Sequence, residues 1–324
     1  MLTLGWPSGP TAKVAHRKMS ELVALLGRLA GIEIVSKAFD TYDELTQACV
    51  RGEIDLAWLP PISFLALIGR DAIAPLASVR SVPYQSAIIT AKESPLHRPA
   101  SLVGQRAAWV DRHSASGFVV PRIKLARFGI DPRGVFSSER FYGSHDAVVS
   151  AVVNGEADFG ATWAHTGKLN AVSGPWTRTS HEVVVLATFG SIPPDVIGAR
   201  VDLAKSARKA IVGALKSIYD ERQNRWLVSH VMGTQAFYRP KLELYGRLQE
   251  AVVDAYQTGL LDLVAPDAVA EPHTGVRRTL EARPRPPNTT IPDVVDEADI
   301  ELVDEQTWSL EEIDGEIDVD VTFD

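Results

Sequence analysis

The chain has 324 residues, of which 45% are hydrophobic, and its formal net charge at pH 7 is −8. A chain of this length can bury a full core and is too long for one small domain. It contains no apolar run near the roughly 18 residues that a membrane-spanning helix requires, and a single cysteine, Cys49, excludes an intramolecular disulfide. These features predict two globular units without a membrane span.

Charge is distributed unevenly along the chain. All 33 Lys and Arg residues lie at or before Arg285, whereas residues 286–324 hold 14 of the 41 carboxylates. The body therefore carries 27 acids against 33 bases. This mildly basic balance suits a small anionic ligand and is too weak to predict a nucleic-acid partner.

The N-terminal part of the chain alternates strand and helix patterns. The expected elements are a strand at 2–5, an amphipathic helix at 11–29, a strand at 32–35, a helix beginning at 42, a strand at 54–59 and a helix at 62–67. Strands separated by helices predict a mostly parallel sheet that helices cover.

One pattern occurs twice, about a hundred residues apart. Residues 42–55 align without a gap on residues 145–158. Each copy predicts a short helix closed by a glycine, Gly52 or Gly155, and then a buried strand. Two such units indicate two similar lobes. Each lobe can direct a helix N-terminus, which attracts anions, at the crevice between them, so we expect the ligand there.

The rest of the body divides at two extended crossings. Residues 78–90 contain Pro83 and Tyr84 and predict the first crossing, and residues near 188–192 predict the return. Between them lie an expected strand at 107–110, helix at 117–128, strand at 135–136, the second repeat copy and a strand at 183–186. Helices at 202–219 and 240–258 are expected to dock on the first lobe. The predicted organisation is a discontinuous lobe 1 (1–82 and 188–265) hinged to lobe 2 (83–187).

The C-terminal region has a different character. Residues 266–292 predict a Pro-rich linker, and residues 293–324 predict a disordered acidic tail or one that folds on a partner. The alternation at 315–323 leaves an edge strand as the alternative. At the other end, the first residues read as a strand and not as a signal peptide, so the chain as written is expected in the cytoplasm.

Two serine-containing turns precede expected helices. The turn at 114–117 reads Ser-Ala-Ser-Gly, and the turn at 143–146 reads Gly-Ser-His-Asp. Small hydroxyl residues at a helix start cap its N–H groups, and in a crevice the same groups can bind an oxyanion. Both interpretations stay open for each turn. His145 in the second turn has Tyr42 as its counterpart in the first repeat copy, another side chain that can form hydrogen bonds.

Taken together, these segments resemble the substrate-binding proteins of phosphonate, phosphite and phosphate ABC transporters. The likeness spans roughly residues 1–260. It rests on several motifs in order, namely residues 42–45, 52–61, 101–110, 114–117, 129–132, 143–149 and 191–195. The resemblance implies a two-lobe α/β fold of the type II periplasmic-binding-protein kind. It also implies that an oxyanion binds between the lobes, with no cofactor.

Motif positions carry the family's ligand-binding residues onto this chain. The implied set is Tyr42, Tyr84, Ser114, Ala115, Ser116, His145 and Asp195. In this interpretation the phenols, serines and histidine donate hydrogen bonds, and Asp195 accepts one from a protonated ligand oxygen. A phosphorus oxyanion offers many acceptor lone pairs, so neutral donors suit it, and a carboxylate is tolerated only where it receives a ligand proton.

The chain departs from the family's pattern at two places. Ala115 stands where the family has threonine, which removes one hydroxyl donor. Residues 163–166 read Trp-Ala-His-Thr where aminophosphonate-binding members place polar residues and a carboxylate, which disfavours an amine-bearing ligand. Trp163 is either a rim residue that packs against an apolar substituent or an ordinary core residue.

Three functions are compatible with these residues. The first is a receptor or sensor that closes on phosphate, phosphite or an alkylphosphonate, with an ABC permease or a protein bound to the acidic tail as partner. The second is an enzyme on the same fold, for which only His145 and Asp195 are acid–base candidates. The third is a ferric-ion-binding protein. The sequence favours the first function, so no catalytic or metal-binding residue is assigned. The family usually works in the periplasm or on a lipid anchor, which differs from the location expected for the chain as written.

Overall fold

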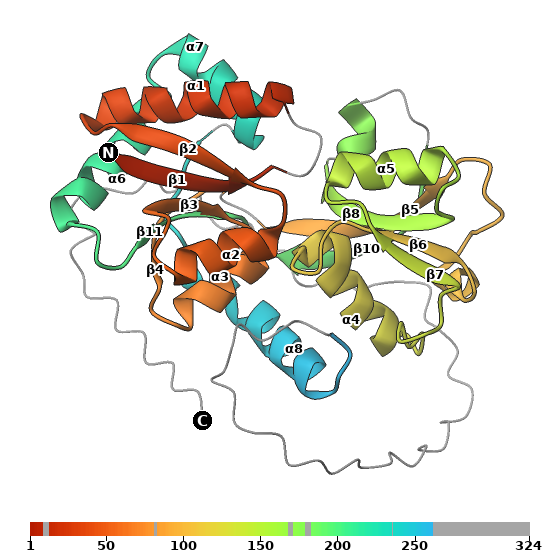
Figure 1. The fold of residues 1–324 in the computed structure, drawn as a ribbon. Helices are drawn as coiled ribbons and strands as arrows, with labels where there is room; N and C mark the ends of the chain where they lie inside the picture. Colours follow the sequence, from red (N-terminus) through yellow and green to blue (C-terminus); the bar gives the residue numbers. More distant parts are fainter. Residues whose placement is uncertain (9–12, 81–82, 168–170, 179–182, 235, 262–324) are drawn as a thin grey trace. The chain divides into compact units, whose positions relative to one another are not determined.

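The computed structural model of the protein describes residues 1–8, 13–80, 83–167, 171–178, 183–234 and 236–261 (Figure 1). The linker predicted at 266–292 and the acidic tail predicted at 293–324 lie outside the described residues. The described residues form one five-stranded and one six-stranded sheet. None of the helices in these ranges combines the length and the hydropathy that a membrane span needs.

The first sheet has the strand order β2-β1-β3-β11-β4. Its elements are β1 (Leu2–Pro7), α1 (Lys13–Ala30), β2 (Ile34–Phe39), α2 (Tyr42–Val50), β3 (Leu56–Leu59), α3 (Pro61–Ile68), β4 (Ile73–Ser78) and β11 (Val196–Arg200). Strand β1 pairs in parallel with β2 and β3, whereas β11 runs antiparallel between β3 and β4. The start of β11 therefore lies beside the carboxyl ends of β3 and β4.

The second sheet repeats this arrangement. Its elements are β5 (Tyr84–Ala91), β6 (Arg106–Trp109), the π-helical turn η2 (Ala115–Val119), α4 (Val120–Arg127), β7 (Ser138–Phe141), α5 (His145–Val153), β8 (Phe159–Thr166), β9 (Val172–Ser173) and β10 (Val183–Ile192). Read from β7, the order β7-β6-β8-β5-β10 matches the first sheet, with β5 as the antiparallel strand. The mostly parallel α/β architecture predicted from the sequence is confirmed.

The repeat seen in the sequence is a structural repeat. Helix α2 leads into β3 and helix α5 leads into β8, at equivalent positions of the two sheets. The four buried residues of α2 occupy the same repeat positions as those of α5. Gly52 and Gly155 follow the helices with φ of 69° and 71°, a left-handed conformation that glycine adopts without strain. The predicted helix-glycine-strand unit is thus confirmed in both copies.

Helices pack through hydrophobic cores on both faces of each sheet. Helix α1 packs on one face of the first sheet with α6 (Lys205–Ser217) and α7 (Arg222–Met232), and α2 and α3 pack on the other, as Figure 1 shows. On the second sheet α4 and α5 lie on opposite faces. The carboxyl ends of the parallel strands form the edge where α/β proteins bind ligands.

The last described helix contacts the cores of both sheets. The segment at 240–258 was expected to dock on the first lobe, and the buried residues Leu248 and Ala255 of its helix α8 (Gly246–Gln257) belong to the core cluster of the second sheet. Tyr245, immediately before it, packs with Phe64 of the first sheet. The segment therefore contacts the cores of both sheets, and the exact lobe boundaries stay a prediction.

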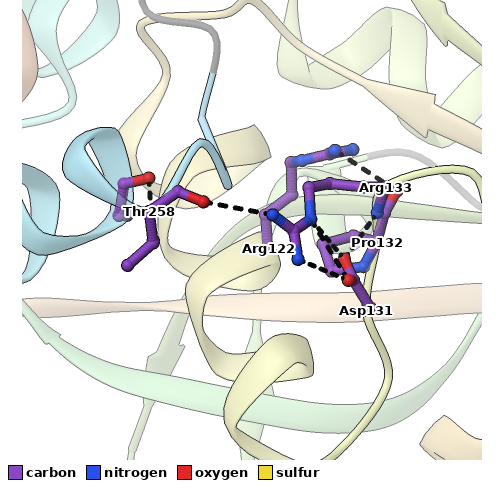
Figure 2. A network of polar contacts seen from close by, with 6 residues as sticks. Arg122, Asp131, Pro132, Arg133 and Thr258 are labelled. Atoms are coloured by element: carbon purple, nitrogen blue, oxygen red, sulfur yellow. Dashed lines mark hydrogen bonds and ion pairs between the residues drawn. The ribbon is translucent and has the colours of Figure 1, made fainter. Parts of the chain in front are cut away.

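An ionic network holds the C-terminal end of α8. The guanidinium of Arg133 donates to the carbonyl oxygen of Thr258 over 3.1 Å and pairs with Asp131 over 2.7 Å (Figure 2). In the same network Arg122 donates to the carbonyl oxygen of Pro132 over 3.2 Å. A cation at a helix C-terminus is stabilising because the dipole end there is negative. Arg133, which directly follows the motif at 129–132, thus links the end of α8 to the segment between α4 and β7.

Gly160→Ala tests the close packing of the second repeat unit. A Cβ at this position of β8 would lie 2.6 Å from Val148 Cγ1 and 3.0 Å from Val152 Cγ2, on the stiff side chains of α5. We expect a loss of about 1–3 kcal/mol in the free energy of unfolding, measured by urea denaturation.

The matched control is Gly213→Ala in the interior of α6, where a Cβ meets no atom within 4 Å. This change is expected to stabilise the protein by about 0.5–1 kcal/mol through helix propensity. Equal effects of the two substitutions would contradict the packing.

Candidate functional site

A cavity of about 590 Å³ lies among the described residues and is lined from both sheets and from α7. Six of the seven predicted ligand-binding residues line it, together with the predicted rim residue: Tyr42, Tyr84, Ser114, Ala115, His145, Asp195 and Trp163. The seventh, Ser116, is buried next to the lining residue Ala115 in the chain and hydrogen-bonds with Tyr84. The structure therefore brings the predicted set together, whereas their role toward a ligand stays a proposal.

Asp195 lies where the inserted strand β11 begins. Its carbonyl oxygen accepts from the backbone N–H of Val79 over 3.0 Å, at the end of β4, and its carboxylate Oδ2 accepts from Trp58 Nε1 over 2.9 Å. Burial raises the pKa of the Asp195 carboxyl to about 6, although the Trp58 hydrogen bond and the charge of Arg80 oppose this rise. The carboxyl can thus gain or lose a proton near neutral pH.

Two tyrosines approach Asp195 from different sheets. Tyr42 opens α2 after the first sheet's β2, and Tyr84 opens β5 of the second sheet. Burial raises the pKa of both phenols well above the usual value, and the charge of Asp195 adds to the rise, while side-chain hydrogen bonds with Ser114 and Ser116 respectively oppose it. Each phenol therefore stays protonated and is a neutral hydrogen-bond donor.

In both serine-containing turns a serine caps the helix that follows. Ser114 Oγ accepts from the backbone N–H of Gly117 over 3.1 Å, and Ser144 Oγ accepts from Ala147 over 3.2 Å. A hydroxyl that accepts at a cap still has one proton to donate, and Ser114 also hydrogen-bonds with Tyr42 across the two sheets. Capping and binding at Ser114 are therefore compatible. At the second turn the cap is Ser144, which leaves the neighbouring His145 side chain to line the cavity.

His145 is oriented by the second sheet. Its ring Nδ1 lies 2.9 Å from Thr162 Oγ1, and Thr162 is fully buried on β8. His145 is the first residue of α5, and it is half-buried in the cavity wall. Because β8 and α5 belong to one repeat unit, the repeat fixes both the position and the rotation of the ring.

Sequence reasoning missed several lining residues. Trp58 and Arg80 both act on Asp195, and His165 and the C-terminal half of α7 line the rest of the cavity. Trp58 falls inside a run that reads only as a buried strand, so its indole N–H gave no signal. The sequence did contain a signal for Arg80, which is a cation in the predicted crossing just before Pro83 and Tyr84.

The site's chemistry weighs against a ferric ion. Hard cations bind phenolate oxygen, yet burial and Asp195 raise the pKa of both Tyr42 and Tyr84. Over the described part of the chain, no group of three or more His, Cys, Asp or Glu residues is arranged to hold a metal ion. A set of neutral donors with one proton-accepting carboxylate matches an oxyanion that carries a proton.

Comparison with known proteins identifies the family. Residues 4–245 match the family of periplasmic phosphonate substrate-binding proteins of ABC transporters. The chain belongs to this family. The phosphate-import protein PhnD of Mycolicibacterium smegmatis (strain ATCC 700084 / mc(2)155) is 26% identical over 152 residues, which are 43% of this chain and 47% of that protein. The match thus spans about half the length of this curated relative.

Solved structures of the family share the fold. PhnD1 from Prochlorococcus marinus (MIT 9301), solved in complex with methylphosphonate, is 16% identical, with a TM-score of 0.65 over 80% of this chain and 98% of that chain. A binding protein of a phosphonate ABC transporter from Pseudomonas aeruginosa is 15% identical, with a TM-score of 0.66 over 82% and 90%. The predicted type II periplasmic-binding-protein fold and the family resemblance are both confirmed.

Asp195→Asn tests the buried carboxyl in the ligand-free protein. Since folding raises the pKa of Asp195 from 3.8 to about 6, the stability that its neutral form contributes is present below about pH 4 and is lost as the pH rises through 6. The neutral amide avoids this loss and still accepts from Trp58.

We therefore expect Asp195→Asn to gain about 2 kcal/mol in unfolding free energy relative to wild type between pH 4 and pH 8. Urea denaturation of both proteins at the two pH values measures this gain. A difference that stays constant with pH would show that Asp195 is ordinarily solvated.

Proposed function

We propose that the protein is a binding receptor for a small phosphorus oxyanion, phosphate, phosphite or an alkylphosphonate, which it holds in this cavity. One observation carries the proposal: a proton-accepting carboxyl with a pKa of about 6, Asp195, lies among neutral hydroxyl donors. Family membership supports the class of function. A relative named for phosphate import and a neighbour solved with methylphosphonate support the choice of ligands.

The hydrogen-bonding pattern suits a singly protonated ligand. Tyr42 and Tyr84 donate to ligand oxygens while their phenol oxygens accept from Ser114 and Ser116, and Asp195 accepts the proton of the remaining P–OH group. Arg80 lines the same cavity and supplies positive charge for the anion. A phosphate or an alkylphosphonate can carry such a proton near neutral pH because its second ionisation falls close to neutrality. A sulfonate has no proton to donate, so its negative charge and that of the Asp195 carboxylate repel each other.

Binding is coupled to closure of the two halves. Lining residues come from both sheets, and contacts already join them: the backbone N–H of Tyr42 donates to Asp111 Oδ2 over 3.3 Å. A ligand that contacts both halves favours the closed arrangement because it binds that state more tightly. In this proposal an ABC permease recognises the closed form.

An enzymatic role is less well supported. His145 and Asp195 were the acid–base candidates, yet His145 is engaged by Thr162 and Asp195 by Trp58. General acid–base catalysis needs a group within hydrogen-bond reach of the transferred proton. The side chains around both residues instead provide donors for an anion, which is what recognition requires.

Selectivity for protonated anions tests the proposal. Isothermal titration calorimetry at pH 7 should detect methylphosphonate binding to the wild-type protein and at least about tenfold weaker binding of methanesulfonate, since about 1–3 kcal/mol attaches to one charge-assisted hydrogen bond. Asp195→Asn should weaken methylphosphonate binding and narrow the gap between the two ligands.

The matched control is Asp202→Asn, whose carboxylate is 71% exposed and pairs with Arg200 outside the cavity. It should leave both affinities unchanged. Equal wild-type affinity for the phosphonate and the sulfonate would refute the assigned role of Asp195, and the absence of binding by phosphate, phosphite and methylphosphonate alike would refute the receptor.

Removal of one phenol hydroxyl tests the donors. Tyr42→Phe should weaken methylphosphonate binding about fivefold, because a neutral hydrogen bond contributes about 1 kcal/mol, with little change in stability. Tyr256→Phe is the matched control, since Tyr256 is 48% exposed on α8 and lies outside the lining. If Tyr42→Phe binds like wild type in the calorimeter, the phenol does not contact the ligand.

A further inference from the structure

We propose that the cavity contains a second subsite that takes an uncharged aromatic substituent of the phosphorus ligand. The subsite is a ring wall formed by Tyr84, His165 and Trp163, all of which line the cavity. The inference rests on the proposed function, because the oxyanion end of the ligand places the substituent against these rings.

The size of the cavity exceeds what an inorganic oxyanion fills. Its volume is about 590 Å³. Phosphate has only five non-hydrogen atoms. Cavities of roughly 300–1,000 Å³ are the usual size for ligands with a ring or more, so there is room beyond the group that Asp195 and the phenols bind.

The ring wall lies on two paired strands. Trp163 and His165 are two residues apart on β8, so both project from the same face of the sheet, and their ring centroids are 5.3 Å apart. The ring of Tyr84, at the start of the antiparallel neighbour β5, lies 6.2 Å from that of His165. Trp163 and His165 are half-buried. Figure 1 shows β5 and β8 side by side in the second sheet.

Closure of the two halves cannot remove this wall. All three rings belong to one sheet and move with it as a unit, whereas closure changes only the distance to residues of the first sheet. The wall also begins at the oxyanion end, because Tyr84 is one of the proposed donors and its hydroxyl hydrogen-bonds with Ser116. A substituent on phosphorus therefore passes from the donors directly onto the rings.

The charge of the lining favours a neutral aromatic group over an ammonium group. Among the described residues that line the cavity, Asp195 is the one carboxylate, and it is engaged by Trp58 beside Arg80. An ammonium group at the ring wall would lack an acidic partner there. Aromatic rings attract one another in offset or edge-to-face arrangements at centroid distances of 4.5–7 Å, so a phenyl-like group gains more here than a saturated ring of equal size.

The experiment compares methylphosphonate, cyclohexylphosphonate and phenylphosphonate by isothermal titration calorimetry. We expect phenylphosphonate to bind the wild-type protein about tenfold more tightly than methylphosphonate and at least about threefold more tightly than cyclohexylphosphonate. In Trp163→Leu the phenyl-to-methyl affinity ratio should fall to about two. The matched control is Phe128→Leu, an exposed aromatic residue outside the lining, which should keep the wild-type ratio.

The outcomes separate this inference from the proposed function. If none of the three phosphonates binds but phosphate or phosphite does, the receptor stands and the aromatic subsite is overturned; if those two anions also fail to bind, the oxyanion receptor itself is wrong. If methylphosphonate binds and phenylphosphonate binds equally or more weakly, the receptor stands and the aromatic subsite is overturned. A phenyl preference that survives in Trp163→Leu also overturns the ring wall. Should that variant fail to fold, the wild-type comparison of phenyl with cyclohexyl decides, and equal affinities overturn the subsite.

Discussion

Burial disfavours the negative charge of the Asp195 carboxylate, and the neighbouring side chains of the site either stabilise that charge or respond to it. Trp58 and Arg80 stabilise the charged form only in part, so the pKa of Asp195 remains near 6. Burial first, and then the charge of the same carboxyl, raises the pKa of Tyr42 and Tyr84 and keeps both phenols protonated. A ligand that brings both a proton and negative oxygens satisfies all three groups at once. In our proposal, ligand selectivity and the stability of the empty protein are therefore two consequences of one buried acid.

The fold produces this arrangement by repeating one αβ unit. In each sheet an antiparallel strand, β11 or β5, pairs with the third parallel strand, and a residue of the candidate site lies at the start of that antiparallel strand. Asp195 precedes β11 and Tyr84 opens β5. The two copies thus bring an acceptor and a donor to one cavity from equivalent places. Recognition needs contacts from both halves, and this symmetry supplies them.

Local pattern was sufficient for much of the fold and for most of the site. The repeat at 42–55 and 145–158 predicted the two similar sheets because helix period and terminal glycine are encoded locally. The order of the family motifs predicted that Tyr42, His145 and Asp195 share one cavity, and all three line it. Trp58 and Arg80 escaped because their roles depend on strand pairing across more than a hundred residues, which puts β11 between β3 and β4. The packing of helix α8 on the core of the second sheet also could not be predicted from local pattern, since its apolar face fits either core and tertiary packing decides.

The most direct test of the account is a crystal structure of the protein grown with methylphosphonate. We predict that the phosphonate lies in the cavity with one oxygen within about 2.5–3.0 Å of the Asp195 carboxylate and others within hydrogen-bond distance of the Tyr42 and Tyr84 hydroxyls. A phosphonate bound away from Asp195, or an empty cavity at a saturating concentration, would contradict it.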